Sequence, residues 1–119
     1  MEIKNIKRGE LYYARLNPVV GSEQGDTRPV LIISNDIGNT HSPTVIVIPL
    51  TGRLRKPRLP THVFIPQGHG PEAHSIALAE QIRTIDRSRI DRYIGRIDGD
   101  LQLEIDMALA AGIGLVISI

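Results

Sequence analysis

The feature that most constrains the fold of this chain is a series of short apolar runs separated by loops rich in Gly, Pro, Asn and Asp. Two of the runs, Pro29–Ser34 and Thr44–Leu50, are almost continuously apolar, as expected for buried strands. Further strands are predicted where strand-forming residues gather between turn signals: Gly9–Leu16, Thr61–Ile65 as an edge strand, Ser75–Ala79 and Arg92–Ile97. Each apolar run is shorter than the roughly 18 residues that a membrane-spanning helix needs.

The segment Leu101–Ala111 fits both a strand and a helix. Its Leu, Ile and Met residues alternate as in a strand, but its apolar residues also fall on one face of a helix. We predict a helix, because Leu, Gln, Glu, Met and Ala favour it and Asp98 or Asp100 can cap its N-terminus. Arg83–Ile90 is expected to form a short turn or helix. The result is a mainly β fold with a C-terminal helix, built as one strongly bent antiparallel sheet or barrel in a single domain over residues 1–119.

The charges are divided along the chain, although the net charge is only +1. Basic residues dominate 28–62, where Asp36 is the one acidic residue, and the charged residues of 98–106 are all acidic. The low net charge argues against a protein that coats nucleic acid by charge alone. A bipolar domain can focus a polyanion on one face, whereas solvated loops and a solvated helix face are the alternative interpretation. The absence of Cys excludes disulfides, zinc–thiolate sites and thiol nucleophiles.

Several stretches, in order and spacing along nearly the whole chain, together resemble the MazF/PemK toxin family, in particular its Gram-positive type. They are Arg8–Tyr12, Leu16–Gly25, Thr27–Leu31, Asn35–Asn39, Ser42–Thr44 with the strand that ends at Thr51, and Glu80–Asp86. The resemblance implies an SH3-like small barrel of the plasmid-toxin (CcdB/PemK-like) fold that forms a homodimer. It also implies an endoribonuclease toxin that cuts single-stranded RNA at specific sequences without a metal ion or other cofactor. A MazE-like antitoxin would neutralise it.

Metal-free RNA cleavage uses the substrate's own 2′-hydroxyl as nucleophile, so the enzyme must remove a proton and stabilise charge on the phosphate. The resemblance implies that Arg28 and Thr51 are the catalytic pair. Arg28 suits the phosphate because its guanidinium stays charged and offers a planar fork of donors. It precedes a proline and should project from an extended strand entry. Thr51 lies at a strand end, and both residues are expected to be accessible. A surface ion pair for Arg28 and a turn hydroxyl for Thr51 are the structural alternatives.

The sequence leaves the identity of the general base open. Arg28 does not suit this role, because Arg hardly deprotonates. Glu23 and Glu80 are the two candidates, and a loop salt bridge for Glu23 or a pairing of Glu80 with Arg83 are equally weighted alternatives. Some PemK-like members carry Arg-x-Asp before the Gln-x-Arg-Thr-Ile-Asp stretch. Here these positions are Leu78 and Glu80, so the acidic position is kept as Glu and the Arg is lost.

Substrate contacts are expected from two predicted loops, Asn17–Thr27 and Asn35–Pro43, and from the basic loop Thr51–Pro60. Short polar side chains read unpaired bases while basic side chains follow phosphates. The predicted contacts are Ser22, Gln24, Asn35, Asn39, Arg53, Arg55, Lys56, Arg58 and Gln81. The four histidines (His41, His62, His69 and His74) share no metal-ligand spacing, and we do not assign them a catalytic role. His41 and His69 are expected to be exposed loop residues.

Two other classes of protein share this pattern of strands. A gyrase poison of the CcdB kind would act by protein binding without catalysis, but such toxins use a C-terminus that includes Trp. This chain has no Trp and ends in 115–119, an apolar tail that we expect to be core or dimer surface. A non-catalytic nucleic-acid-binding member would have another residue in place of Arg28 or Thr51, and both are present here. The charged N-terminus lacks a signal-peptide core, which favours the cytoplasm and no membrane association.

Overall fold

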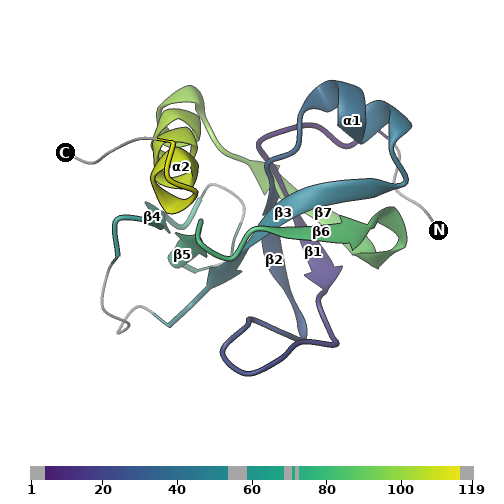
Figure 1. Ribbon diagram of the computed structural model, residues 1–119, viewed down its shortest axis with the longest axis horizontal. Coiled ribbons are helices and arrows are strands. Elements are labelled where there is room, and N and C mark those ends of the chain that lie inside the picture. Colours follow the sequence, from purple (N-terminus) through teal and green to yellow (C-terminus); the bar gives the residue numbers. More distant parts are fainter. Residues whose placement is uncertain (1–4, 54–58, 69–70, 72, 116–119) are drawn as a thin grey trace.

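A computed structural model describes residues 5–53, 59–68, 71 and 73–115. Within these residues the chain is a sheet of seven strands with two α-helices, α2 beside β4 and α1 beside β3, as Figure 1 shows. The elements are β1 (Glu10–Arg15), β2 (Thr27–Ile32), α1 (Asp36–His41), β3 (Thr44–Thr51), β4 (His62–Ile65), β5 (Ser75–Leu78), β6 (Arg83–Asp86), η1 (Arg87–Arg89), β7 (Ile90–Arg96) and α2 (Gly99–Gly112).

β3 is the central strand of the sheet and pairs with β2, β5 and β6. One edge of β3 pairs with β2, which continues the sheet through β1 to β7. Its other edge pairs first with β6 along 44–47 and then with β5 along 50–51, and β4 follows β5. All of these pairings are antiparallel. The predicted mainly β fold is confirmed. In the described part of the chain β4 and β7 are the two ends of the strand order, so the sheet does not close into a barrel.

Both faces of the central strands are buried, which explains their continuous apolar sequences. Successive side chains of a strand point to opposite faces, and here the side chains of each face pack into a separate hydrophobic core. Leu31 and Ile48 belong to the core under α2, whereas Val30 and Val47 belong to the core on the opposite face. A shift of register by one residue would exchange the two sets.

The C-terminal helix is confirmed, and its packing resolves the ambiguity between helix and strand. Asp98 is the N-cap, and its side chain accepts a hydrogen bond from the Leu101 amide at 2.9 Å. Leu101 and Ile105 face the core, while Leu103 and Met107 are more than half exposed. Burial therefore follows the helical period rather than alternation. Among the described residues, no helix is long and apolar enough to cross a membrane.

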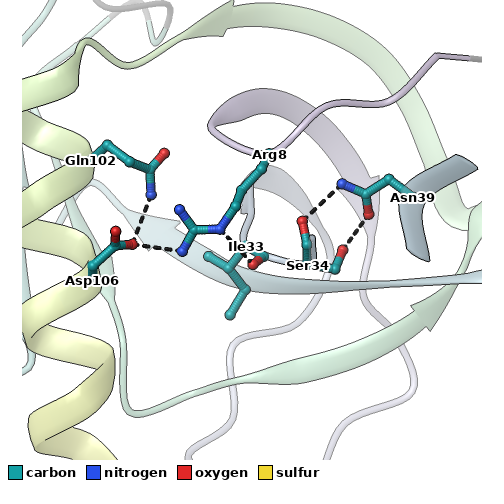
Figure 2. A network of polar contacts seen from close by, with 6 residues as sticks. All are labelled: Arg8, Ile33, Ser34, Asn39, Gln102 and Asp106. Carbon is teal, nitrogen blue, oxygen red and sulfur yellow. Dashed lines mark hydrogen bonds and ion pairs between the residues drawn. The ribbon is translucent and has the colours of Figure 1, made fainter. Parts of the chain in front are cut away.

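A polar network anchors α2 to the start of the chain (Figure 2). The Arg8 guanidinium donates to the Ile33 carbonyl oxygen at 3.1 Å and pairs with the Asp106 carboxylate at 2.6 Å. Gln102 donates to the same carboxylate at 3.0 Å. Part of the acidic cluster, which the alternative interpretation placed on a solvated helix face, is thus bonded within the protein.

Two local predictions were wrong. The loop after β2 contains the short helix α1, which is capped by the Asn35 side chain accepting from the Gly38 amide at 2.8 Å. The cap residue and Asp36 in the first turn were the available signals, but the helix has no apolar stripe. Residues 83–86 form strand β6 rather than a turn or helix, although the turn is present as η1. β6 buries Ile85 alone, so its alternation is too short to recognise.

The apolar tail falls largely outside the described residues. Residues 116–119 are not described, and Leu115 is 75% exposed. In this chain Leu115 is therefore not part of the core. Dimer surface remains the prediction for the tail.

Candidate functional site

Arg28 on β2 reaches the end of β3, where Thr51 lies. The antiparallel pairing of these strands stops at Val30 and Pro49, two residues away from Arg28 and from Thr51. The Arg28 guanidinium donates through Nε to the Gly25 carbonyl oxygen at 2.7 Å and through Nη1 to the Leu50 carbonyl oxygen at 3.5 Å. In the described part of the chain no carboxylate lies within ion-pair distance of Arg28. Its charge is therefore held in place but is not neutralised.

Arg28 and Thr51 differ in accessibility. Arg28 is half-buried, in agreement with the expected strand entry. Thr51 is only 3% exposed, so the expectation that it is accessible was wrong. Its hydroxyl oxygen accepts from the Arg53 amide at 3.2 Å, as hydroxyls near strand ends often do. A hydroxyl that accepts one bond still has its own proton to donate.

The loop between β1 and β2 fixes the carbonyl that holds Arg28. Asn17 and Asp26 exchange two hydrogen bonds of 3.0 Å at its base, and the Leu16 amide donates to the Asp26 carbonyl at 3.0 Å. Gly25 packs so closely that a Cβ there would lie 2.6 Å from Asn17 Oδ1. Any other residue would therefore force the side chains of Asn17 and Val19 to move, and Asn17 holds the base of the loop.

A cavity of about 390 Å³ lies between this loop, β3 and the start of β6. Gln24 and Gln81 are in contact in its wall, where the backbone amide of Gln24 donates to the side-chain oxygen Oε1 of Gln81 at 3.0 Å. The structure thus brings together four of the predicted site residues. The full lining is Leu16, Pro18, Glu23, Gln24, Val47, Pro49, Glu80, Gln81, Ile82 and Arg83.

The two candidate bases have different surroundings. Glu23 is exposed, and its Oε1 accepts from the Val20 amide at 2.9 Å. Both oxygens of Glu80 are occupied, by the Thr61 hydroxyl at 2.9 Å and by His62 Nε2 at 3.1 Å. Burial alone would raise the pKa of Glu80, but its hydrogen bonds outweigh burial and hold the pKa below its ordinary value. Glu80 is thus a weaker base than an ordinary glutamate, and its side-chain partners are Thr61 and His62 rather than Arg83.

The other predicted contacts fall into three groups. Ser22 is exposed on the loop, as is Asn35 at the start of α1. Asn39 is fully buried, donating to the Ser34 carbonyl at 2.8 Å and accepting from the Ser34 hydroxyl, as Figure 2 shows. The prediction that Asn39 reaches RNA was therefore wrong, because both ends of its amide hold the β2–α1 turn. Arg53 is exposed, whereas Arg55, Lys56 and Arg58 lie outside the described residues.

Sequence reasoning missed two residues of this region. Arg83 lines the cavity and donates through Nη2 to the Pro18 carbonyl oxygen at 3.3 Å. The His62 side chain is 4% exposed and accepts from the Leu59 amide through Nδ1 at 3.3 Å. Arg83 stands inside a recognised motif, so its position was available as a signal. No group of three or more His, Asp or Glu residues in the described ranges is placed to hold a metal ion.

The described residues thus form a small protein built on an open antiparallel sheet, in which a half-buried arginine without a carboxylate partner is available to an anionic ligand. Residues 7–113 match the family of PemK-like, MazF-like toxins of type II toxin–antitoxin systems. The chain is 49% identical over 112 residues to endoribonuclease EndoA of Bacillus subtilis, covering 93% of this chain and 97% of that protein. This chain therefore belongs to the PemK-like, MazF-like toxin family.

Solved structures agree with this assignment. The crystal structure of MazF from Deinococcus radiodurans matches with a TM-score of 0.81 and 26% identity, covering 94% of this chain and 99% of that one. A mycobacterial endoribonuclease in complex with its cognate antitoxin matches with a TM-score of 0.74 and 27% identity, covering 92% and 96%. The family resemblance read from the sequence is confirmed. These relatives support the endoribonuclease interpretation and not the gyrase-poison alternative.

Proposed function

We propose that this chain, an endoribonuclease toxin of the MazF type, cuts single-stranded messenger RNA at specific sequences without a metal ion. The 2′-hydroxyl before the cut attacks the adjacent phosphorus and expels the 5′-oxygen of the next nucleotide. The products carry a 2′,3′-cyclic phosphate and a 5′-hydroxyl. The observation that carries this proposal is the guanidinium of Arg28, which no carboxylate of the described residues neutralises and which reaches the Leu50 carbonyl oxygen, next to Thr51.

Arg28 would stabilise the charge that builds up on the phosphate. Two backbone carbonyls already hold its guanidinium, so little reorganisation is needed when the substrate binds. Such preorganised charges account for a large part of enzymatic rate enhancement. Thr51 supplies a hydroxyl beside it, whose proton can bind a phosphate oxygen. The exposed Ser22, Asn35 and Arg53 and the basic loop with Arg55, Lys56 and Arg58 would contact the rest of the strand.

Glu23 is the better candidate for the general base. Both Glu80 oxygens are bonded, and the lowered pKa of Glu80 weakens it as a proton acceptor. Glu23 also lines the cavity, and within the described residues its carboxylate accepts through Oε1 alone, from the Val20 amide. We assign Glu80 instead to the cavity wall, where it accepts from Thr61 and His62.

A MazE-like antitoxin is the proposed protein partner, and the toxin is proposed to work as a homodimer in the cytoplasm. A groove that accepts phosphates also suits an acidic, partly disordered peptide with a few apolar anchors. A symmetric dimer would present two such grooves. Binding of antitoxin should weaken with salt and should exclude an uncleavable RNA. Charge reversal at Arg53, Arg55 and Lys56 should weaken both ligands, whereas inhibition with RNA still bound would contradict direct competition.

The test of the proposed activity is incubation of the purified protein with a long defined RNA in excess EDTA, followed by mapping of the new 5′ ends. We expect discrete cuts whose 5′ ends are hydroxyls, and so accept phosphate from a kinase without prior phosphatase treatment. Arg28→Ala is the matched control for contaminating ribonuclease. Loss of cutting in EDTA with recovery in magnesium would contradict the metal-free mechanism.

A further inference from the structure

A second hollow of the surface lies where β1 ends and the loop to β2 begins. It is open to solvent and has a volume of about 680 Å³. Its lining residues are all polar, and they are Arg15, Asn17, Asp26, Thr27 and Arg89. Because no described residue of this lining is apolar, the hollow does not suit the face of a ring. Its donors suit phosphate oxygens, which arginine, threonine and asparagine commonly contact in nucleic-acid complexes.

Backbone carbonyl oxygens hold the two guanidiniums of the hollow in place. Arg15 donates through Nη2 to the Ser88 carbonyl oxygen in η1. Arg89 donates through Nη1 to the carbonyl oxygen of Arg15 at 3.1 Å and to that of Asn17. The two side chains therefore cross between the end of β1 and η1. Within the described residues each guanidinium is bonded through one nitrogen, so its other N–H groups remain for a ligand.

The hollow carries a surplus of positive charge. Its lining has two guanidiniums and one carboxylate, that of Asp26. The Asp26 carboxylate accepts from the Asn17 side chain at 3.0 Å. Among the described residues no carboxylate, Asp26 included, lies within ion-pair distance of Arg15 or Arg89. Two like charges at one hollow repel each other, and an anion bound between them would relieve this repulsion.

The hollow adjoins the end of the sheet from which Arg28 projects. In the register of β1 and β2, Arg15 is opposite Thr27, the residue before Arg28. Successive residues of a strand point to opposite faces, so Arg15 and Arg28 flank the same strand ends from two sides. An RNA strand bound at Arg28 therefore has to pass only this end of the sheet to reach the hollow.

We propose that the hollow of Arg15 and Arg89 is a second phosphate site for the RNA, which binds the backbone of nucleotides outside the cut. The inference rests on the proposed ribonuclease function and adds a contact that lengthens the substrate. Because backbone contacts carry no sequence information, this site strengthens the binding of long RNAs whatever their bases. A purely structural role, holding η1 against β1, would leave the affinity for RNA unchanged in a folded variant.

The first experiment measures the affinity of the full chain for a long RNA with one 2′-deoxyribose at the cut, at several salt concentrations. The variants are Arg15→Gln, Arg89→Gln and their combination. We expect each single variant to weaken binding by on the order of tenfold, through the loss of a charge-assisted hydrogen bond. The slope of log K against log salt should fall by about 0.7 for each lost phosphate contact on a single strand.

Arg96→Gln is the matched control for loss of one positive charge. Arg96 is exposed on β7 and is paired with Glu10, at the opposite end of β1 from Arg15. This variant should keep nearly the wild-type affinity and salt slope. Thermal unfolding of each variant establishes that it is folded.

A second measurement starts from the wild type and so does not depend on the folding of a variant. In the same uncleavable RNA, one phosphate at a time is replaced by a neutral methylphosphonate. We expect a position outside the cut where this replacement weakens binding by about tenfold. In the double variant the same replacement should have little further effect, because its partner is already gone. A site for free phosphate would instead lose this contribution when inorganic phosphate is added at constant ionic strength.

Four results would overturn the inference. Wild-type affinity and salt slope in the folded double variant would leave Arg15 and Arg89 only their structural role between β1 and η1. The absence of a methylphosphonate position that depends on the two arginines would do the same. A loss confined to RNAs of one sequence would place them on a base edge, and displacement by inorganic phosphate would assign the hollow to a free anion. If the wild type cuts RNA in these cases, the proposed function stands and only the second site fails; if the wild type cuts no RNA, both fail.

Discussion

Arg28→Ala removes the group on which the proposed chemistry depends most. The side chain is half-buried, and it is tied to the Gly25 and Leu50 carbonyl oxygens rather than to a carboxylate. Truncation therefore leaves no buried acid without its partner. The structural cost is mainly the 2.7 Å bond from Nε to the Gly25 carbonyl, and loss of one such bond costs about 1 kcal/mol of unfolding free energy.

The catalytic cost of Arg28→Ala should be much larger. Removal of one preorganised donor to a developing oxyanion lowers kcat by about 10²–10³-fold, equivalent to roughly 3–4 kcal/mol. Arg28→Lys keeps the charge but loses the planar fork. A lysine cannot hold Gly25 and bind two phosphate oxygens in the same way, so an intermediate rate is expected.

Single-turnover cleavage of a labelled oligonucleotide with saturating protein measures the chemical step apart from binding. Arg92→Ala, which removes an exposed arginine from β7, is the control for loss of positive charge. Folding is checked by urea unfolding. If folded Arg28→Ala cleaves within about threefold of the wild-type rate, the assignment of Arg28 is wrong. If the variant is unfolded, the expected loss of about 1 kcal/mol of unfolding free energy is wrong.

Three further predictions test other parts of the structure. Thr51→Ala should slow cleavage by on the order of 10²-fold, while Thr51→Ser should keep most of the rate. Equal rates for both variants would mean that the Thr51 hydroxyl has only the structural role of accepting from the Arg53 amide. Because the pKa of Glu80 is lowered from 4.5 in the folded protein, its carboxylate stabilises the fold above that pH, and this contribution is lost as the pH falls through the lowered pKa. The difference in Tm between wild type and Glu80→Gln should therefore shrink on acidification below about pH 4.5, and a difference that grows would contradict the sign. Ile105→Ala, at a fully buried position on the core-facing side of α2, should cost about 2–5 kcal/mol in urea unfolding, and a cost below about 1 kcal/mol would show that this core is poorly packed.

The sequence predicted the parts of the fold that rest on long, regular patterns. The runs that became β2 and β3 are apolar on both faces because each face fills a different core. The helix α2 was predicted from its residue types and from Asp98 or Asp100 as its N-cap, and the cap is Asp98. β6 was missed because its identity comes from pairing with β3, a contact between distant segments, and not from its own four residues.

The candidate site was predicted in its membership more than in its arrangement. Arg28, Glu23, Glu80 and Gln81 were named from the motif stretches, but motifs do not reveal how each side chain is bonded. The burial of Asn39 depends on Ser34, which lies across the β2–α1 turn. Likewise, the occupied oxygens of Glu80 depend on the approach of β4 to the end of β5. Such facts arise from tertiary packing, which local sequence does not specify.

The most direct test of the account is cleavage of an RNA with one 2′-deoxyribose at the nucleotide before a mapped cut. The proposed mechanism takes its nucleophile from that hydroxyl, so the modified strand should bind with nearly unchanged affinity and remain uncut in EDTA or magnesium. The same RNA with the deoxyribose moved several nucleotides away should be cut at the normal rate. Normal cutting of the first strand would mean that water or a protein group attacks the phosphorus, and the roles given to Arg28 and Thr51 in a metal-free transesterification would be contradicted.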